Sequence, residues 1–224
     1  MLTEAQLEQF GQYLPFFQSL SEQQRTEIRR YASVREFSPG QLPHAGKDQC
    51  TGLVAVGSGQ LRAYITSAQG RQITLYRLLE RDVCIISASC IIKEMAYDIC
   101  IEAEKQSSVF ILPSEVYERL NNSSPEVKDF TLSVVSARFT EIMWVLEQLV
   151  FSSQGQRLAN LLLEHMALEG ADTLHLTHEA MAADLGTARE VVTRLLKYLQ
   201  DEGVVSLSRG AVTILDRAAL RKLG

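Results

Sequence analysis

The stretch from Pro125 to Phe151 constrains this chain most, because it continues for 27 residues without a glycine or a second proline. Ser124 is a good N-cap and proline suits the first helical position, so one long helix is predicted over 124–151. Apolar residues recur along it at alternating spacings of three and four, which places them in two stripes. The first stripe is Leu132, Val135, Phe139, Ile142, Leu146 and Leu149, and the second is Val127, Phe130, Val134, Ala137 and Trp144.

A helix with two apolar stripes needs two partners. The rest of its own chain can cover one stripe, and the same helix of a second copy can cover the other. We therefore predict a homodimer with the first stripe as the seam of a parallel, two-fold coiled coil. Two alternatives stay open: the helix is buried inside a monomer, or the second stripe forms the seam.

The region between Tyr31 and Pro113 alternates short β-like runs with glycine turns, for example around Gly57 and Gly70. This pattern predicts an antiparallel β-roll, which is a double-stranded, jelly-roll-like β-helix. Before the roll, two short helices are expected over Thr3–Leu20 and Ser21–Tyr31, with Ser21 as the N-cap of the second. They are expected to pack against the roll.

The polar segment Ser152–Gly155 is a predicted domain boundary. Beyond it we expect a helix to about Glu169, a strand over 174–176, two helices, and a hairpin of strands over 204–208 and 211–215. The fold class is therefore α+β. Its expected parts are a β-roll domain with N-terminal helices over 1–123, a dimerisation helix over 124–151, and a smaller domain over 152–224.

Composition restricts the class of protein less than the spacing of apolar residues and glycines does. The net charge is −5, with 14 basic and 18 acidic residues before Phe151 and 8 and 9 from there on, so bulk charge gives no support for nucleic-acid binding. No long apolar run appears and the first ten residues are polar, which predicts a cytoplasmic protein without membrane contact. The cysteines form no CxxC pair and are expected to be thiols: Cys50, Cys84, Cys90 and Cys100.

The strongest local signal lies in residues 177–199, which read as two helices joined by a tight turn. Ala182 is small enough to let the helices approach, Gly186 can adopt the positive φ of the turn, and Val192 fills the space between the helices. The remaining apolar residues are expected to complete a small core: Met181, Leu185, Leu195, Leu196 and Leu199.

With that side of the second helix buried, polar residues fall on its opposite side. An arginine fork matches O6 and N7 of guanine in the major groove, and a glutamate can accept from N4 of cytosine. Arg209 and Gly210 lie between two strands, as at the tip of a wing whose arginine holds a phosphate. The motif therefore favours DNA binding over a merely solvated helix surface. The candidate DNA-binding residues are Thr187, Arg189, Glu190, Thr193, Arg194, Lys197 and Arg209.

At this point the arrangement resembles the CRP/FNR family of regulators across nearly the whole chain, with a β-roll, a long dimer helix and a winged helix-turn-helix. The stretch 186–197 is similar to the recognition helix of that family. The resemblance implies that Arg189, Glu190 and Arg194 contact bases, with Thr193 modulating them, in a palindromic operator with half-sites about one helical turn apart. It also implies a transcription regulator that alters recruitment of RNA polymerase.

The β-roll departs from the cyclic-nucleotide pattern of the family. The family's phosphate cassette pairs Gly-Glu with a following Arg-Ser or Arg-Thr, whereas residues 80–92 here read ERDVCIISASCII. Cyclic AMP and cyclic GMP are therefore not expected. An N-terminal iron–sulfur cluster is not expected either, because no cysteine precedes Cys50.

The effector and any cofactor consequently remain unidentified. The candidate effector region is Cys84, Ser87, Ser89 and Cys90, for which redox switching, thiol modification, metal binding and plain burial of the thiols are open alternatives. Haem ligation by His44 is a further alternative, although a single loop histidine is more typical of polar surface.

Other classes of protein fit less well. A cupin-like metalloenzyme needs several histidines converging inside the barrel, and only His44 lies in that half of the chain. No GxSxG motif indicates a hydrolase, so no catalytic residues or metal ligands are assigned and an enzyme is not expected. A winged helix that binds protein instead of DNA is the remaining alternative.

Overall fold

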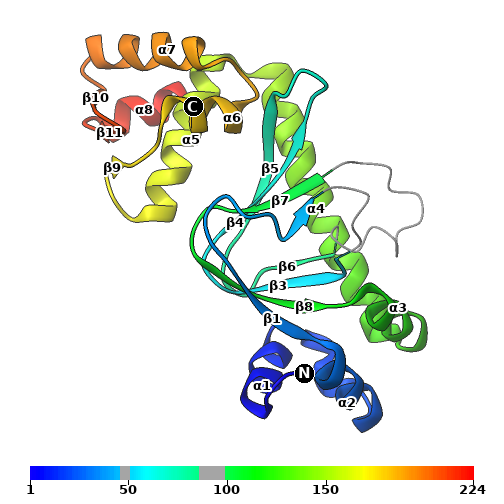
Figure 1. Cartoon of the computed structure of the whole chain (residues 1–224). Coiled ribbons are helices and arrows are strands. Elements are labelled where there is room, and N and C mark those ends of the chain that lie inside the picture. The colour runs from blue at the N-terminus through cyan, green and yellow to red at the C-terminus, as the bar shows by residue number, and fades with distance from the viewer. Residues whose placement is uncertain (46–50, 86–98) are drawn as a thin grey trace. The chain divides into compact units, whose positions relative to one another are not determined.

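A computed structural model describes residues 1–45, 51–85 and 99–224. The candidate effector residues Ser87, Ser89 and Cys90 therefore lie outside the described residues. The chain divides into two compact units, which are described separately: residues 1–65 with 75–142, and residues 66–74 with 143–224 (Figure 1).

Antiparallel strands form two four-stranded sheets, in the orders β1-β8-β3-β6 and β2-β7-β4-β5. The predicted β-roll is therefore confirmed. Its tight turns need glycine: Gly59 has φ +92° between β3 and β4, and a side chain there would overlap Gln106 and Ser107. The strands are β1 (Ser33–Phe37), β2 (His44–Ala45), β3 (Leu53–Ser58), β4 (Leu61–Thr66), β5 (Gln72–Leu78), β6 (Val83–Cys84), β7 (Ile99–Ala103) and β8 (Ser107–Leu112).

The N-terminal segment differs from the prediction in one respect. The helix expected over Thr3–Leu20 is instead α1 (Glu4–Gln12) followed by the 3-10 helix η1 (Pro15–Ser19). Pro15 explains the break, because proline offers no N–H to the turn before it and its ring clashes with the preceding turn of an α-helix. The second helix, α2 (Glu22–Tyr31), forms as predicted, with Ser21 as its N-cap.

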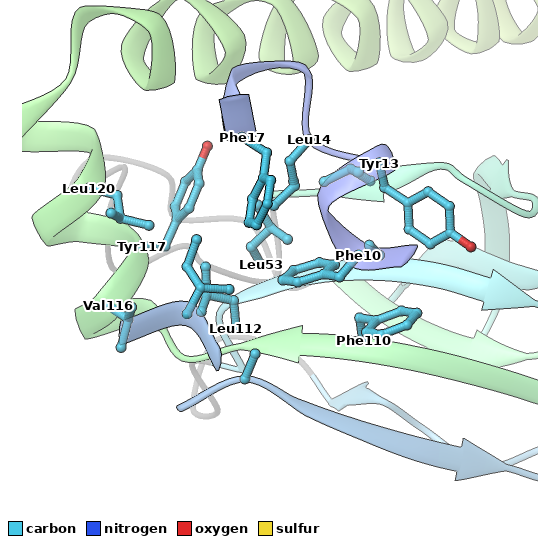
Figure 2. Close-up of a cluster of buried hydrophobic side chains, with 14 of the residues drawn as sticks. Phe10, Tyr13, Leu14, Phe17, Leu53, Phe110, Leu112, Val116, Tyr117 and Leu120 are labelled. Carbon is cyan, nitrogen blue, oxygen red and sulfur yellow. The ribbon is translucent and has the colours of Figure 1, made fainter. Parts of the chain in front are cut away.

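The core of the first unit lies where α1, η1 and α3 (Ser114–Ser123) cover β3 and β8 (Figure 2). The rings of Phe10 and Phe110 stack with centroids 5.1 Å apart. Tyr117 on α3 is fully buried, and its hydroxyl lies 2.7 Å from Oγ1 of Thr131. Burial raises the pKa of Tyr117 to about 12, so this phenol stays neutral and hydrogen-bonded.

The predicted long helix is confirmed as α4 (Pro125–Phe151), with Ser124 Oγ accepting from the Val127 amide. The first half of the second stripe packs on the first unit: Val127 belongs to its core, and the partly buried Phe130 and Val134 pack against that core. The first stripe is largely exposed within one chain, with Leu132 66% and Phe139 62% accessible.

Arg138 on α4 is only 8% exposed, which the apolar pattern did not predict. Its guanidinium lies 4.7 Å from the ring centroid of Tyr76 on β5 and donates to the Val83 carbonyl on β6 at 3.4 Å. Glu141 accepts from Nη1, at 2.7 Å to one of its oxygens. A buried cation is thereby compensated by a carboxylate, a carbonyl and an aromatic ring.

The second unit forms a helical bundle with a small sheet in the order β10-β11-β9. The predicted helix, strand, two helices and hairpin are all present, and a final helix, α8, was not predicted. The elements are α5 (Gln154–Glu169), β9 (Thr173–Leu174), α6 (His178–Leu185), α7 (Arg189–Asp201), β10 (Val205–Ser208), β11 (Ala211–Ile214) and α8 (Arg217–Leu223).

In the part of the chain that the structure describes, no helix has both the length and the apolar character that crossing a membrane requires.

Candidate nucleic-acid interface

The turn between α6 and α7 is built as the sequence predicts. Thr177 caps α6 by accepting from the Ala180 amide at 3.0 Å, and Gly186 ends the helix in the left-handed region at φ +64°. Ala182 is 3% exposed and Val192 is fully buried, so the two helices close on each other at these positions. The turn glycine thus fixes where α7 begins, at Arg189.

Buried polar groups of α5 hold α6 in place. The guanidinium of Arg157 donates to the Leu185 carbonyl at the C-terminus of α6, where carbonyls lack helical partners. Desolvation lowers the pKa of this buried guanidinium, although arginine remains charged at any physiological pH. His165 Nε2 lies 3.4 Å from Oδ2 of Asp184, and both side chains are buried.

One side of α7 is buried and the other is exposed. Val192, Leu196 and Leu199 belong to the core of the unit. Arg189, Glu190, Thr193, Arg194 and Lys197 are all exposed on the helix, and Thr187 is half-buried in the turn before it. Among the described residues, none of the cations Arg189, Arg194 and Lys197 is engaged in an ion pair. Their charges are therefore available to a partner that carries negative charge.

The wing is an antiparallel hairpin in which Ser208 pairs with Ala211. Arg209 and Gly210 form its tip, Gly210 has φ +74°, and the Arg209 side chain is exposed. An open hollow of about 330 Å³ lies between the wing and the two helix starts. Its lining includes Thr177, His178, Glu179, Arg189, Ser208 and Gly210.

Sequence reasoning missed one residue at this surface. His178, the first residue of α6, places Nδ1 2.8 Å from Oγ1 of Thr193 on α7. The two residues are 15 positions apart and belong to different helices, so no local pattern connects them. The only signal was the presence of a histidine beside the N-cap.

Of the candidate effector residues in the first unit, the structure describes only Cys84. Cys84 is fully buried, with Sγ 3.7 Å from the Tyr76 hydroxyl, and Cys100 is half-buried. His44 is 2% exposed and contacts Oγ1 of Thr51 at 3.1 Å, so the expectation of polar surface was wrong. The reason is that β2 pairs with β7 and carries His44 into the roll. Within the described ranges no cluster of three metal-ligating side chains is present.

Comparisons with known proteins agree with this geometry. Residues 156–223 match the Crp-like helix-turn-helix domain family. A protein from Eubacterium rectale assigned to the CRP/FNR family of transcriptional regulators is 42% identical, with a TM-score of 0.92 over 95% of this chain and 98% of that one.

Two curated relatives are more distant. The "Cyclic AMP receptor protein" of Thermus thermophilus is 26% identical over 209 residues, which are 93% of this chain and 96% of that protein. The "Global nitrogen regulator" of Synechococcus elongatus is 27% identical over 119 residues, about half of each chain.

These relatives are transcription regulators and not enzymes. The 42% identity to the Eubacterium protein over nearly its whole length and the matched helix-turn-helix domain therefore exclude the cupin-like enzyme considered above. The chain belongs to the CRP/FNR family of transcriptional regulators.

Proposed function

We propose that the chain acts as a homodimer that binds a palindromic operator through α7 under the control of an effector. The observation that carries this proposal is the exposed side of α7, where Arg189, Glu190 and Arg194 lie in the N-terminal half of the helix with their side chains exposed. This is the end of a recognition helix that enters the major groove. Arg209 at the wing tip is proposed to contact a phosphate.

The dimer is proposed to form along the first stripe of α4. Leu146 and Leu149 are 47% and 41% exposed in a single chain, in addition to Leu132 and Phe139. Exposed apolar residues repeating in this way on one helix match a coiled-coil seam. A parallel two-fold dimer would present two copies of α7, as a palindrome requires.

The effector is proposed to be something other than a cyclic nucleotide. The Thermus relative is named for cyclic AMP, but residues 80–92 here contain neither the Gly-Glu pair nor the following Arg-Ser or Arg-Thr of the family's phosphate cassette. The position of the operator relative to RNA polymerase would determine activation or repression, as for other family members.

Selection from a pool of random-sequence duplexes with the full chain tests the proposed function. We expect enrichment of a palindrome with half-site centres about 10 base pairs apart, and a steep loss of affinity as salt rises. Enrichment of no sequence, with weak and salt-independent binding, would contradict DNA recognition and favour a winged helix that binds protein.

A further inference from the structure

Two hydrogen bonds meet at the hydroxyl oxygen of Thr193. Oγ1 lies 2.9 Å from the carbonyl oxygen of Arg189, one helical turn earlier, and 2.8 Å from Nδ1 of His178. A carbonyl can only accept, and a threonine hydroxyl carries a single hydrogen. If that hydrogen pointed to His178, two oxygens would face each other at 2.9 Å without a hydrogen between them. The hydroxyl therefore donates to Arg189 and accepts from a hydrogen on Nδ1.

This assignment fixes the chemistry of both side chains. Nδ1 carries a hydrogen in one neutral tautomer of histidine and in the imidazolium, so the bond to Thr193 exists in either protonation state. Thr193 donates its only hydroxyl hydrogen to the backbone carbonyl of Arg189. It therefore has no donor left for a base, although its side chain is exposed on the side of α7 that carries Arg189 and Arg194.

We propose that His178 is a positioning residue for base recognition, which holds the Thr193 hydroxyl against the backbone so that Thr193 offers its methyl group to DNA. The complementary group in the major groove is the C5-methyl of thymine. This inference rests on the proposed function, because it assigns a base preference to a helix that is proposed to read DNA. Without His178, only the bond to the Arg189 carbonyl holds the hydroxyl, so the side chain can change rotamer and donate to a base instead.

The contribution of the methyl contact is measured with deoxyuridine, which differs from thymidine only by that methyl group. The full chain first selects its operator from a random-sequence duplex pool. Each thymine of one half-site is then replaced by deoxyuridine, and the dissociation constants are measured by fluorescence anisotropy. We expect one position at which the wild type loses about fourfold in affinity, the loss expected for one buried methyl group.

Two substitutions at Thr193 separate the methyl from the hydroxyl. Thr193→Ser keeps the hydroxyl and lacks the methyl, so its ratio of thymine to uracil affinity should fall to about one at that position. Thr193→Val keeps a methyl at the same branch and lacks the hydroxyl. Because valine in a helix strongly prefers one rotamer, that methyl stays in place without help from His178, and the ratio should stay near that of the wild type.

Three substitutions at His178 test the positioning role. Asparagine places its amide nitrogen where Nδ1 lies, whereas glutamine places its amide nitrogen where Nε2 lies. We expect His178→Asn to keep the discrimination between thymine and uracil, and His178→Gln and His178→Ala to lose it. A general loosening of the fold would weaken binding to both duplexes equally and leave the ratio unchanged, so the ratio reports positioning and not stability.

The outcomes distinguish this inference from the proposed function. Failure to enrich any duplex, together with weak and salt-independent binding, would overturn the proposed function. An enriched operator without a uracil-sensitive thymine would leave that function standing and overturn the inference. The inference is also overturned if His178→Ala retains the wild-type ratio, or if Thr193→Val loses the ratio while Thr193→Ser keeps it, since the hydroxyl would then be the reading group.

Discussion

The helices α4 and α7 each have buried residues and an exposed side, but the two exposed sides have opposite chemistry. On α4 the exposed side is apolar, with Phe139 and Leu146 among its residues. On α7 it is charged, with Arg189 and Arg194 uncovered. Exposed apolar surface is unfavourable in water and indicates a protein partner, whereas solvated cations suit a polyanion. The chain thus exposes two surfaces of opposite chemistry, and under the proposed function the apolar one would determine how many copies of the charged one act together.

The largest effect is expected from breaking the apolar surface. Phe139→Glu would bury an unpaired carboxylate at the proposed seam, so the variant should be monomeric by sedimentation. Loss of the second reading helix should reduce operator affinity by about 10²- to 10⁴-fold. Ser133→Glu adds the same charge at another exposed position of α4 and should remain dimeric. A dimeric Phe139→Glu variant would instead indicate that the stripe through Trp144 is the seam.

A smaller loss is expected from removing charge on α7. Arg189→Ala and Arg194→Ala should each cost about 1–3 kcal/mol on the selected operator and relax the preference at one base pair. Competition binding with operators altered at single positions measures both quantities. Arg221→Ala removes an exposed arginine from α8 of the same unit and serves as the control. Unchanged affinity and selectivity in either α7 variant would refute its assignment as a base-contacting residue.

A substitution in the turn between α6 and α7 should displace the exposed cations of α7 without changing their number. Gly186→Ala places a side chain at φ +64°, which should lower the free energy of unfolding of the second unit by about 1–2 kcal/mol. Thermal unfolding measures the stability loss, and affinity should fall by a similar factor for all DNA sequences. Full stability with reduced affinity would show that the turn affects binding by another route.

The smallest effect is expected at the wing. Arg209→Ala should weaken binding by about the same factor on specific and non-specific duplexes, and reduce the slope of log affinity against log salt by about one. A titration at several salt concentrations measures the slope. A change confined to one operator sequence would mean that Arg209 reads a base and not a phosphate.

The features predicted correctly from the sequence depend on local rules. Ser124 and Pro125 start α4. Gly186 adopts the positive φ that ends α6 and begins the turn to α7. A local signal for α3 was present but not used, because Val116, Tyr117 and Leu120 follow a helical spacing after Pro113. Similarly, Asp216 caps α8 by accepting from two amides.

The features that were missed depend on contacts between distant residues. The burial of His44 follows from the pairing of β2 with β7, some 55 positions away, and periodicity within one segment cannot show it. The contact between His178 and Thr193 depends on how closely α6 and α7 pack. The candidate DNA-binding residues could be proposed from the sequence because one helix carries most of them, whereas His178, the proposed positioning residue for Thr193, lies on another helix.

The buried guanidinium of Arg138 has a mechanical consequence for α4. A single peptide bond separates Arg138, which is held by Tyr76 and the Val83 carbonyl, from Phe139 on the proposed seam. Successive residues of a helix point about 100° apart, so the two side chains leave the same turn in different directions and have different neighbours. A displacement of β5 or β6 that breaks these contacts would leave a buried cation less well compensated, directly beside a residue of the proposed seam. In the proposed dimer, the two copies of Arg138 would therefore tie the strand that ends at Cys84 to the seam on both sides of the two-fold axis.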